Sequence, residues 1–155
     1  MIEIKFVEVD NADLLMLVSA LDSFFYDRYQ DATLKYQKYH DLSQMACAAV
    51  AYLDGGPAGC CCWKPVDAVT AEIKRMFVRQ VCRGQGIARQ LAAKIEAHAA
   101  ASGCHRAVLE TGADMADAIA VYEKLGYQIC EGFGDFTDDH AVTCMEKEIS
   151  DGTMR

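Results

Sequence analysis

The sequence predicts a mixed α/β fold, with a central sheet of about seven strands and helices on both faces. Two observations support this prediction. Segments in which apolar and polar residues alternate are interspersed with segments in which apolar residues recur at helical spacing, and a strand, a glycine loop and a helix follow one another in mid-chain. The 155 residues are expected to form one domain over residues 1–149, with a frayed tail over 150–155.

The N-terminal third predicts a strand followed by two helices. Apolar and charged residues alternate at first, which is typical of a half-buried strand over residues 2–9. Asp10 or Asn11 can cap the next helix. A second short helix is expected over residues 32–39. The apolar residues of the first helix recur at helical spacing: Leu14, Leu17, Val18, Leu21, Phe24 and Phe25.

The middle of the chain predicts a hairpin and a third strand. The strands over 46–53 and 58–63 are joined by an Asp-Gly-Gly-Pro turn at 54–57. A loop over 64–68 follows, and the strand over 71–78 leads to the glycine loop.

The C-terminal half continues the alternation of helices and strands. A helix with an apolar face ends at Gly103, and a second helix, capped by Asp114 or a neighbour, runs through Leu125 to a C-terminal Gly126. Strands are expected over 107–111, 127–130 and 141–149, with a loop over 131–139.

The glycine loop Arg83–Ala88 carries the clearest chemical signal. A loop that opens a helix presents free backbone N–H groups to an anion, and Arg83 adds a charged donor, so a diphosphate-bearing cofactor is the natural ligand. The Walker A pattern is absent, and the dinucleotide pattern would need glycine where the chain has Arg89. A plain glycine-rich turn before a helix is the alternative interpretation.

Composition excludes several other classes of protein. The net charge of −8 argues against nucleic-acid binding, and no apolar run approaches the ~20 residues of a membrane span. The N-terminus mixes acidic and basic residues, unlike a secretory signal, so we expect a cytoplasmic protein. The eight cysteines lack zinc spacing, and the consecutive Cys60–Cys62 alternate between strand faces, so we expect reduced thiols and no metal.

Four sequence blocks together resemble the GNAT superfamily of N-acetyltransferases over about residues 1–149. The Arg83–Ala88 loop, with its Arg-x-x-Gly-x-Ala pattern, resembles the acyl-CoA loop of that superfamily. The other blocks are Glu72–Val78 before the loop, Leu109–Gly112 with Ala118–Tyr127 after it, and Phe133–Phe136 with Met145–Lys147 near the end.

The resemblance implies the GNAT acyl-CoA N-acyltransferase fold, with acetyl-CoA as co-substrate. The backbone of the strand before the loop would run beside the pantetheine arm, and one of its N–H groups would polarise the thioester carbonyl. The loop would hold the pyrophosphate. The cofactor-binding residues expected in this way are Met76, Phe77, Val78, Arg83, Gly84, Gln85, Gly86, Ile87, Ala88 and Ala118.

Acetyl transfer to an amine requires a base and an acid. An ammonium group with a pKa of ~10.4 must lose a proton before it can attack, and the departing thiolate must gain one. By resemblance, Tyr122 is the expected acid and Glu72 the expected base. Glu110, on the adjacent strand, is a second candidate base. The alternatives are a core aromatic role for Tyr122, and for Glu72 an ion pair with Lys74 or Arg75.

The resemblance implies an N-acetyltransferase that acts on a primary amine of a small molecule or peptide, by direct attack in a ternary complex. The alternative is a non-catalytic acyl-CoA-binding regulatory module. A homodimer is also expected, because family members often pair. The residues expected at the acceptor site are Phe24, Tyr26, Tyr29, Glu110 and Phe136, of which the four aromatic residues could instead be packing residues.

Overall fold

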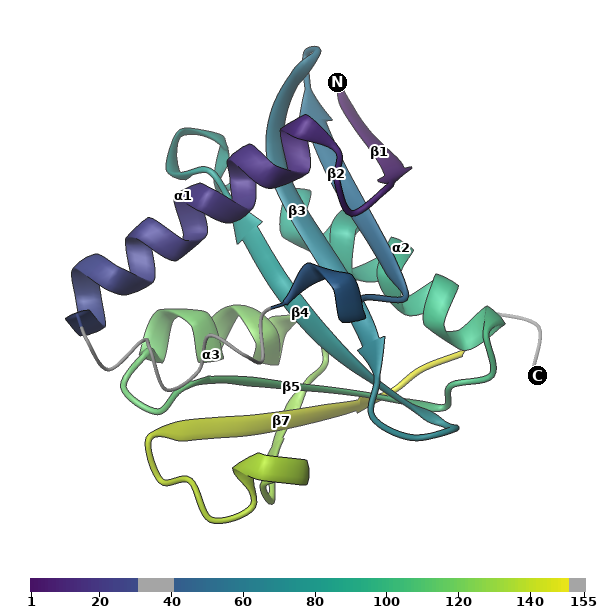
Figure 1. The fold of residues 1–155 in the computed structure, drawn as a ribbon, viewed down its shortest axis with the longest axis vertical. Coiled ribbons are helices and arrows are strands. Elements are labelled where there is room, and N and C mark those ends of the chain that lie inside the picture. The colour runs from purple at the N-terminus through teal and green to yellow at the C-terminus, as the bar shows by residue number, and fades with distance from the viewer. Residues whose placement is uncertain (31–40, 151–155) are drawn as a thin grey trace. The chain divides into compact units, whose positions relative to one another are not determined.

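The computed structural model describes residues 1–30 and 41–150, so the helix expected over 32–39 and the tail after Ser150 lie outside the described residues. Its strands form a seven-stranded sheet of order β1-β2-β3-β4-β5-β7-β6 (Figure 1). The strands are β1 (Ile2–Val7), β2 (Cys47–Leu53), β3 (Gly56–Pro65), β4 (Thr70–Val78), β5 (Arg106–Gly112), β6 (Gln128–Cys130) and β7 (Val142–Glu148).

The helices of the described part are α1 (Ala12–Tyr29), α2 (Ile87–Ala101) and α3 (Ala116–Lys124), with short 3₁₀ turns η2 (Leu42–Gln44), η3 (Gln80–Cys82) and η4 (Gly134–Phe136). The β4–β5 ladder is parallel, whereas the β1–β2, β2–β3, β5–β7 and β6–β7 ladders are antiparallel. The mixed α/β fold is therefore confirmed. No helix of the described residues is long and apolar enough to cross a membrane.

The chain divides into two compact units. Unit 1 comprises Met1–Lys64 and Lys74–Ile95, and unit 2 comprises Pro65–Ile73 and Glu96–Arg155.

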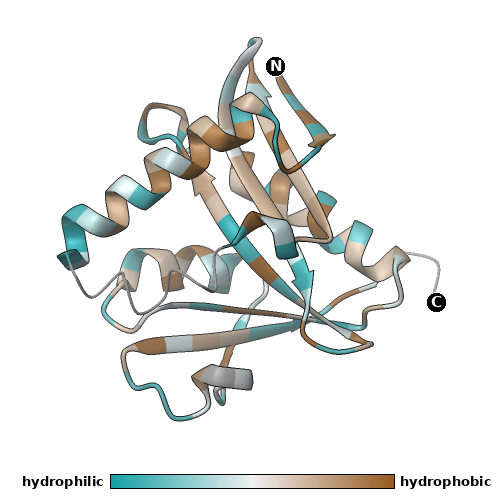
Figure 2. Ribbon diagram, in the orientation of Figure 1, coloured by the Kyte–Doolittle hydropathy of each residue, from teal (hydrophilic) through white to brown (hydrophobic). Residues whose placement is uncertain are grey.

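In unit 1, helices cover both faces of the β2–β3 hairpin. The α1 residues Leu14, Leu17 and Val18 pack against alternate residues of the two strands, Ala48, Val50, Cys60 and Cys62. On the opposite face, Leu91 of α2 lies against Gly59 of β3. Figure 2 shows that the first half of α1 is hydrophobic, whereas its C-terminal end is hydrophilic. The first half of α1 therefore anchors the helix.

The start of α1 is fixed by Asn11. Its side-chain oxygen accepts hydrogen bonds from the N–H groups of Asp13 (2.9 Å) and Leu14 (3.1 Å), which satisfies two donors that the helix itself leaves free. The prediction of a cap at Asp10 or Asn11 is confirmed at Asn11.

The hairpin between β2 and β3 is tighter than the sequence suggested. Leu53 pairs with Gly56, so only Asp54 and Gly55 form the loop, both with positive φ (51° and 87°). Such loops match the right-handed twist of antiparallel strands, so β3 begins before Pro57 rather than after it. The strand also runs on to Pro65, into the expected loop.

The consecutive cysteines alternate between the two faces of β3, as expected. Cys60 and Cys62 belong to the α1-facing core, whereas Cys61 pairs with Ala49 on the other face. Burial raises the pKa of Cys60 to about 12. All eight cysteines of the chain are free thiols.

In unit 2, the helix α3 begins after a backbone turn rather than a side-chain cap. Met115, not Asp114, occupies the N-cap position, and its side chain makes no capping hydrogen bond. Met115 N–H instead donates to Gly112 at 3.0 Å, which closes a tight turn directly after β5. The turn sets the start of the helix, and of the expected cap positions, Asp114 or a neighbour, the N-cap falls at the neighbour Met115.

Candidate functional site

The glycine loop of unit 1 has the backbone conformation that its sequence predicts. Gly84 and Gly86 adopt φ values of 83° and 84°, a region that other residues rarely occupy. A Cβ atom at Gly84 would meet nothing within 4 Å, so conformation, rather than lack of space, requires glycine there. Left-handed residues of this kind turn backbone N–H groups into a concave surface that suits an anion.

The loop leads directly into the free end of α2. The N–H of Gln90 makes the first helical hydrogen bond, to Gly86 at 3.1 Å, so the N–H groups of Ile87–Arg89 precede the helical ladder. Buried Cys82 and Ile87 anchor the two sides of the loop, while Gly84 and Gln85 stay exposed. This cradle of exposed donors at a helix N-terminus fits a diphosphate.

Arg83 fastens the loop to the end of β4. Its Nε donates a 2.9 Å hydrogen bond to the carbonyl of Val78, and the residue is exposed. One predicted anion-binding donor is therefore used inside the protein, where it fixes the loop relative to the strand. Gln85 makes a longer bond of 3.4 Å to the carbonyl of Cys82.

Gly59 of β3 is a residue of the site that the sequence interpretation missed. A Cβ atom there would lie 2.7 Å from the carbonyl oxygen of Phe77, closer than real Cβ contacts. The glycine thus lets the backbone of β4 approach β3 at Met76–Val78, the stretch expected to contact the cofactor. In this stretch Met76 and Phe77 are half-buried and Val78 is buried. An isolated glycine in a strand is the signal that could have revealed it.

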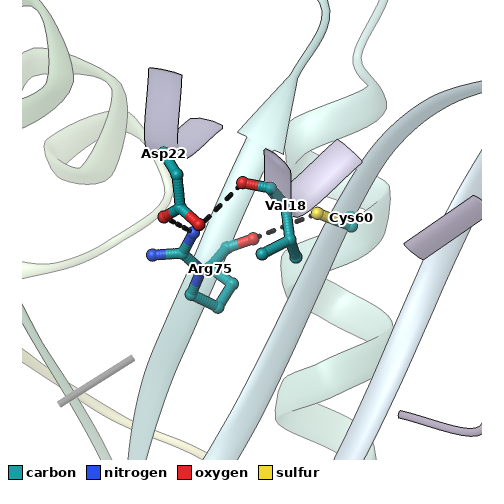
Figure 3. Close-up of polar contacts among 4 residues, drawn as sticks. All are labelled: Val18, Asp22, Cys60 and Arg75. Atoms are coloured by element: carbon teal, nitrogen blue, oxygen red, sulfur yellow. Dashed lines mark hydrogen bonds and ion pairs between the residues drawn. The ribbon is translucent and has the colours of Figure 1, made fainter. Parts of the chain in front are cut away.

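A second missed feature is a buried arginine beneath α1. Arg75 is 4% exposed and its Nη2 donates to Asp22 and to the carbonyl of Val18 (Figure 3). The sequence interpretation considered Glu72 as a partner of Arg75, but the ion pair of Arg75 is with Asp22. No sequence pattern pointed to Asp22, which lies 53 positions away.

In unit 2, the two candidate bases share one face of the sheet. Glu72 pairs with Val108, two positions before Glu110, and Glu110 pairs with Cys144. The pKa of Cys144 is raised, mainly by burial and to a smaller extent by the charges of Glu110 and Glu72. Both carboxylates therefore contribute to the electrostatic surroundings of the same thiol. Glu72 is only 4% exposed, whereas Glu110 is half-buried.

The candidate acid, Tyr122, lies half-buried on α3. Its ring meets the ring of Tyr127 edge to face, with 5.9 Å between centroids, and its carbonyl accepts a 3.0 Å hydrogen bond from Tyr127 N–H. Ala118, expected to contact the cofactor, is half-buried one turn earlier on the same side of the helix.

The residues expected at the acceptor site differ in exposure. Phe24 (40%) and Tyr26 (49%) are exposed on α1, and Tyr29 is half-buried there. In unit 2, Phe136 is 4% exposed, packs edge to face on Phe133, and lines a hollow of about 300 Å³ together with Cys130 and Cys144. Packing is therefore a clear role of Phe136, while the aromatic residues of α1 are open to contact.

In the described part of the chain, no group of three or more His, Cys, Asp or Glu residues is placed to hold a metal ion.

Comparison with known proteins gives the family. A profile of the acetyltransferase (GNAT) family matches residues 14–127, so the chain belongs to this family. The class predicted from the sequence, an acyltransferase domain, is confirmed.

Among curated proteins, an IAA acetyltransferase from Azospirillum brasilense is 41% identical over 78 residues, which are 50% of this chain and 51% of that protein. The uncharacterized N-acetyltransferase YsnE from Bacillus subtilis is 35% identical over 94 residues, 59% of this chain and 62% of that protein. The matched segment thus spans about half to three fifths of these relatives.

Among solved structures, an acyl-CoA N-acyltransferase from Klebsiella pneumoniae superposes with a TM-score of 0.79 at 27% identity, covering 96% of this chain and 98% of that one. A GNAT family acetyltransferase from Elizabethkingia anophelis, solved with acetyl-CoA bound, gives 0.70 at 20% identity with the same coverage. These likenesses confirm the predicted GNAT fold.

Proposed function

We propose that this protein transfers an acetyl group from acetyl-CoA to a primary amine of a small molecule or peptide, by direct attack in a ternary complex. The observation that carries the proposal is the loop between β4 and α2, in which left-handed Gly84 and Gly86 open a helix with free N–H groups. Membership of the acetyltransferase (GNAT) family supports it.

The residues of the chain divide the binding task. The N–H groups of Gly84–Ala88 would hold the pyrophosphate, and the backbone of Met76–Val78 would contact the pantetheine arm and polarise the thioester carbonyl. Gly59 gives this stretch its close approach to β3. Ala118 would contact the cofactor from α3. Acetyl-CoA supplies the activated carbon that the amine attacks.

Glu72 and Tyr122 would move the protons. Glu72, directly or through water, accepts the proton that the ammonium must lose. The amine nitrogen then bonds to the thioester carbon, the carbon–sulfur bond breaks, and Tyr122 gives its hydroxyl proton to the sulfur. The second amine proton, lost as the amide forms, restores Tyr122. The burial of Glu72 supports its role, because a buried carboxylate is shielded from competing water.

Calorimetric titration with acetyl-CoA tests this proposal, with desulfo-CoA and NADH as controls. We expect saturable acetyl-CoA binding that Gly86→Glu abolishes, because the new carboxylate would repel the pyrophosphate. Gly103→Glu is the matched control: Gly103 also has a positive φ (106°) but lies at the other end of α2. No heat and no thermal stabilisation at millimolar acetyl-CoA would overturn the proposal.

Turnover separates the enzyme from the alternative function. Mass spectrometry of a panel of amines after incubation with acetyl-CoA should reveal an acetylated product. Binding without product from any amine would favour a non-catalytic acyl-CoA-binding module. The expected homodimer stays a prediction, which sedimentation velocity would check.

A further inference from the structure

Arg75 in unit 1 has donors without acceptors. Its side chain is 1% exposed, and within residues 1–30 and 41–150 only Nη2 is engaged, by Asp22 and by the carbonyl of Val18 at 3.3 Å. A guanidinium carries five N–H groups, of which one is on Nε and two are on Nη1. Among the described residues, neither Nε nor Nη1 has a hydrogen-bond partner. In Figure 3 the rest of the guanidinium points away from Asp22 and Val18.

The charge of Arg75 is also incompletely balanced. The side chain of Asp22 is 61% exposed, so water screens its charge, whereas the guanidinium is almost fully buried. A buried cation with unpaired donors is unfavourable unless another acceptor approaches it. A planar carboxylate matches both the charge and the geometry of a guanidinium.

The backbone at Arg75 is unusual as well. In the middle of β4, Arg75 adopts φ = 57°, a value that non-glycine residues in strands normally avoid. Its carbonyl oxygen accepts a 3.3 Å hydrogen bond from the thiol of Cys60 on β3. Residues held in sparsely populated backbone regions cluster at active sites and ligand clamps. On β4 the strained residue stands three positions after Glu72 and directly before Met76.

We propose that Arg75 binds a carboxylate of the acceptor, so that the acceptor is an amino acid or an amino-acid-like amine. This inference rests on the proposed function, because it names the substrate class of that reaction. A carboxylate that binds the guanidinium end-on takes one N–H from Nη1 and one from Nη2. It therefore competes with Asp22 for Nη2, and the exposed Asp22 can turn into water to admit it.

The test uses matched sets of amines with saturating acetyl-CoA and mass-spectrometric initial rates. Each set contains an L-amino acid, its amide and its decarboxylated amine. We expect the wild type to favour the amino acid. Arg75→Gln should raise KM for the amino acid about 10- to 100-fold, because charged hydrogen bonds are lost, and leave KM for the decarboxylated amine nearly unchanged.

Two further variants sharpen the test. Asp22→Asn removes the competing charge and should lower KM for the amino acid but not for the amide. Arg106→Gln is the control for loss of an arginine–carboxylate pair, because Arg106 pairs with Glu146 at the surface of unit 2, and should leave all three KM values unchanged. If Arg75→Gln does not fold, the sign of the Asp22→Asn effect decides the question.

Several outcomes would overturn the inference. One is a wild type that does not distinguish the amino acid from its amide. Another is an Arg75→Gln variant that loses activity equally on all three amines, which would indicate a structural role. If no amine is acetylated, the proposed function fails, and calorimetry of N-acetyl amino acids against their amides tests Arg75 alone. Carboxylate-dependent heat that Arg75→Gln abolishes would then sustain the carboxylate site, and its absence would refute it.

Discussion

The hydroxyl group of Tyr127 donates a 2.8 Å hydrogen bond to Glu96, a carboxylate only 7% exposed, in unit 2. The other oxygen of Glu96 accepts a 2.8 Å hydrogen bond from Lys147, whose ammonium lies 5.6 Å from the centre of the Tyr127 ring. One buried carboxylate thus ties the C-terminal part of α2 to β7 and to the residue that precedes β6. The ring of Tyr127 in turn supports Tyr122, the candidate acid.

Tyr127→Phe is expected to destabilise the protein by about 1–3 kcal/mol, because it removes a donor from a buried carboxylate. Urea denaturation would measure the free energy of unfolding. The matched control is Arg106→Gln, which breaks the partly exposed pair of Arg106 with Glu146 and should cost about 0–1 kcal/mol. Equal losses of unfolding free energy in the two variants would contradict the prediction that the buried hydrogen bond of Tyr127 contributes more than the partly exposed ion pair of Arg106.

The features predicted correctly from the sequence are mostly local. The alternation after Ile2, the cap at Asn11 and the glycines of the Arg83–Ala88 loop depend on residues a few positions apart, and the structure has each of them. At α3 the sequence left the cap open between Asp114 and a neighbour, and a tight turn after β5 places Met115 at the N-cap.

The features that the sequence could not reveal are long-range pairings. Glu96 and Tyr127 are 31 positions apart, and Asp22 and Arg75 are 53 apart. Neither pair has a spacing that local periodicity can detect, since each forms only when separate elements pack. The positive φ of Arg75 was equally hidden, because the left-handed region is predicted from glycine and asparagine rather than from arginine.

The stability of the protein should fall at alkaline pH through Tyr52. Its hydroxyl donates a 2.6 Å hydrogen bond to Asp13, and this bond, followed by burial, raises the pKa of Tyr52 to about 12. An unfolded tyrosine has a pKa of ~10. The contribution is therefore complete below pH ~10 and is lost between pH ~10 and 12, as the unfolded chain releases its proton first.

Tyr52→Phe should abolish this part of the pH dependence. At neutral pH it should cost about 0.5–1.5 kcal/mol through the lost hydrogen bond. Denaturation curves at several pH values from neutral to about 11 would give the free energy of unfolding as a function of pH. Its slope at alkaline pH should be shallower for the variant than for the wild type. Parallel slopes for the variant and the wild type would show that Tyr52 does not titrate as expected.

Gly59→Ala should damage both stability and cofactor binding. The new Cβ would lie 2.7 Å from the carbonyl of Phe77, so the backbone of β3 or β4 must shift, at a cost of about 1–3 kcal/mol. Gly56→Ala, at the start of the same strand, is the matched control, because its Cβ would meet only an ordinary contact at 3.7 Å. Thermal melting and acetyl-CoA calorimetry would compare the two variants. Equal melting temperatures and equal acetyl-CoA affinities would contradict the claim that Gly59 is needed for the close approach of β3 and β4.

Kinetic measurements can decide whether Glu72 or Glu110 is the base. Both residues lie on one face of the sheet in unit 2. Glu72→Gln should lower kcat about 10²- to 10⁴-fold if Glu72 accepts the proton of the amine, whereas Glu110→Gln should change kcat little. Each variant keeps the shape of its side chain, and calorimetry should show unchanged acetyl-CoA binding in both.

Because raising the pH increases the fraction of free amine, the defect of Glu72→Gln should shrink as the pH approaches ~10. A larger loss in Glu110→Gln would transfer the role to Glu110, which lies on the same face of the sheet and is less buried than Glu72.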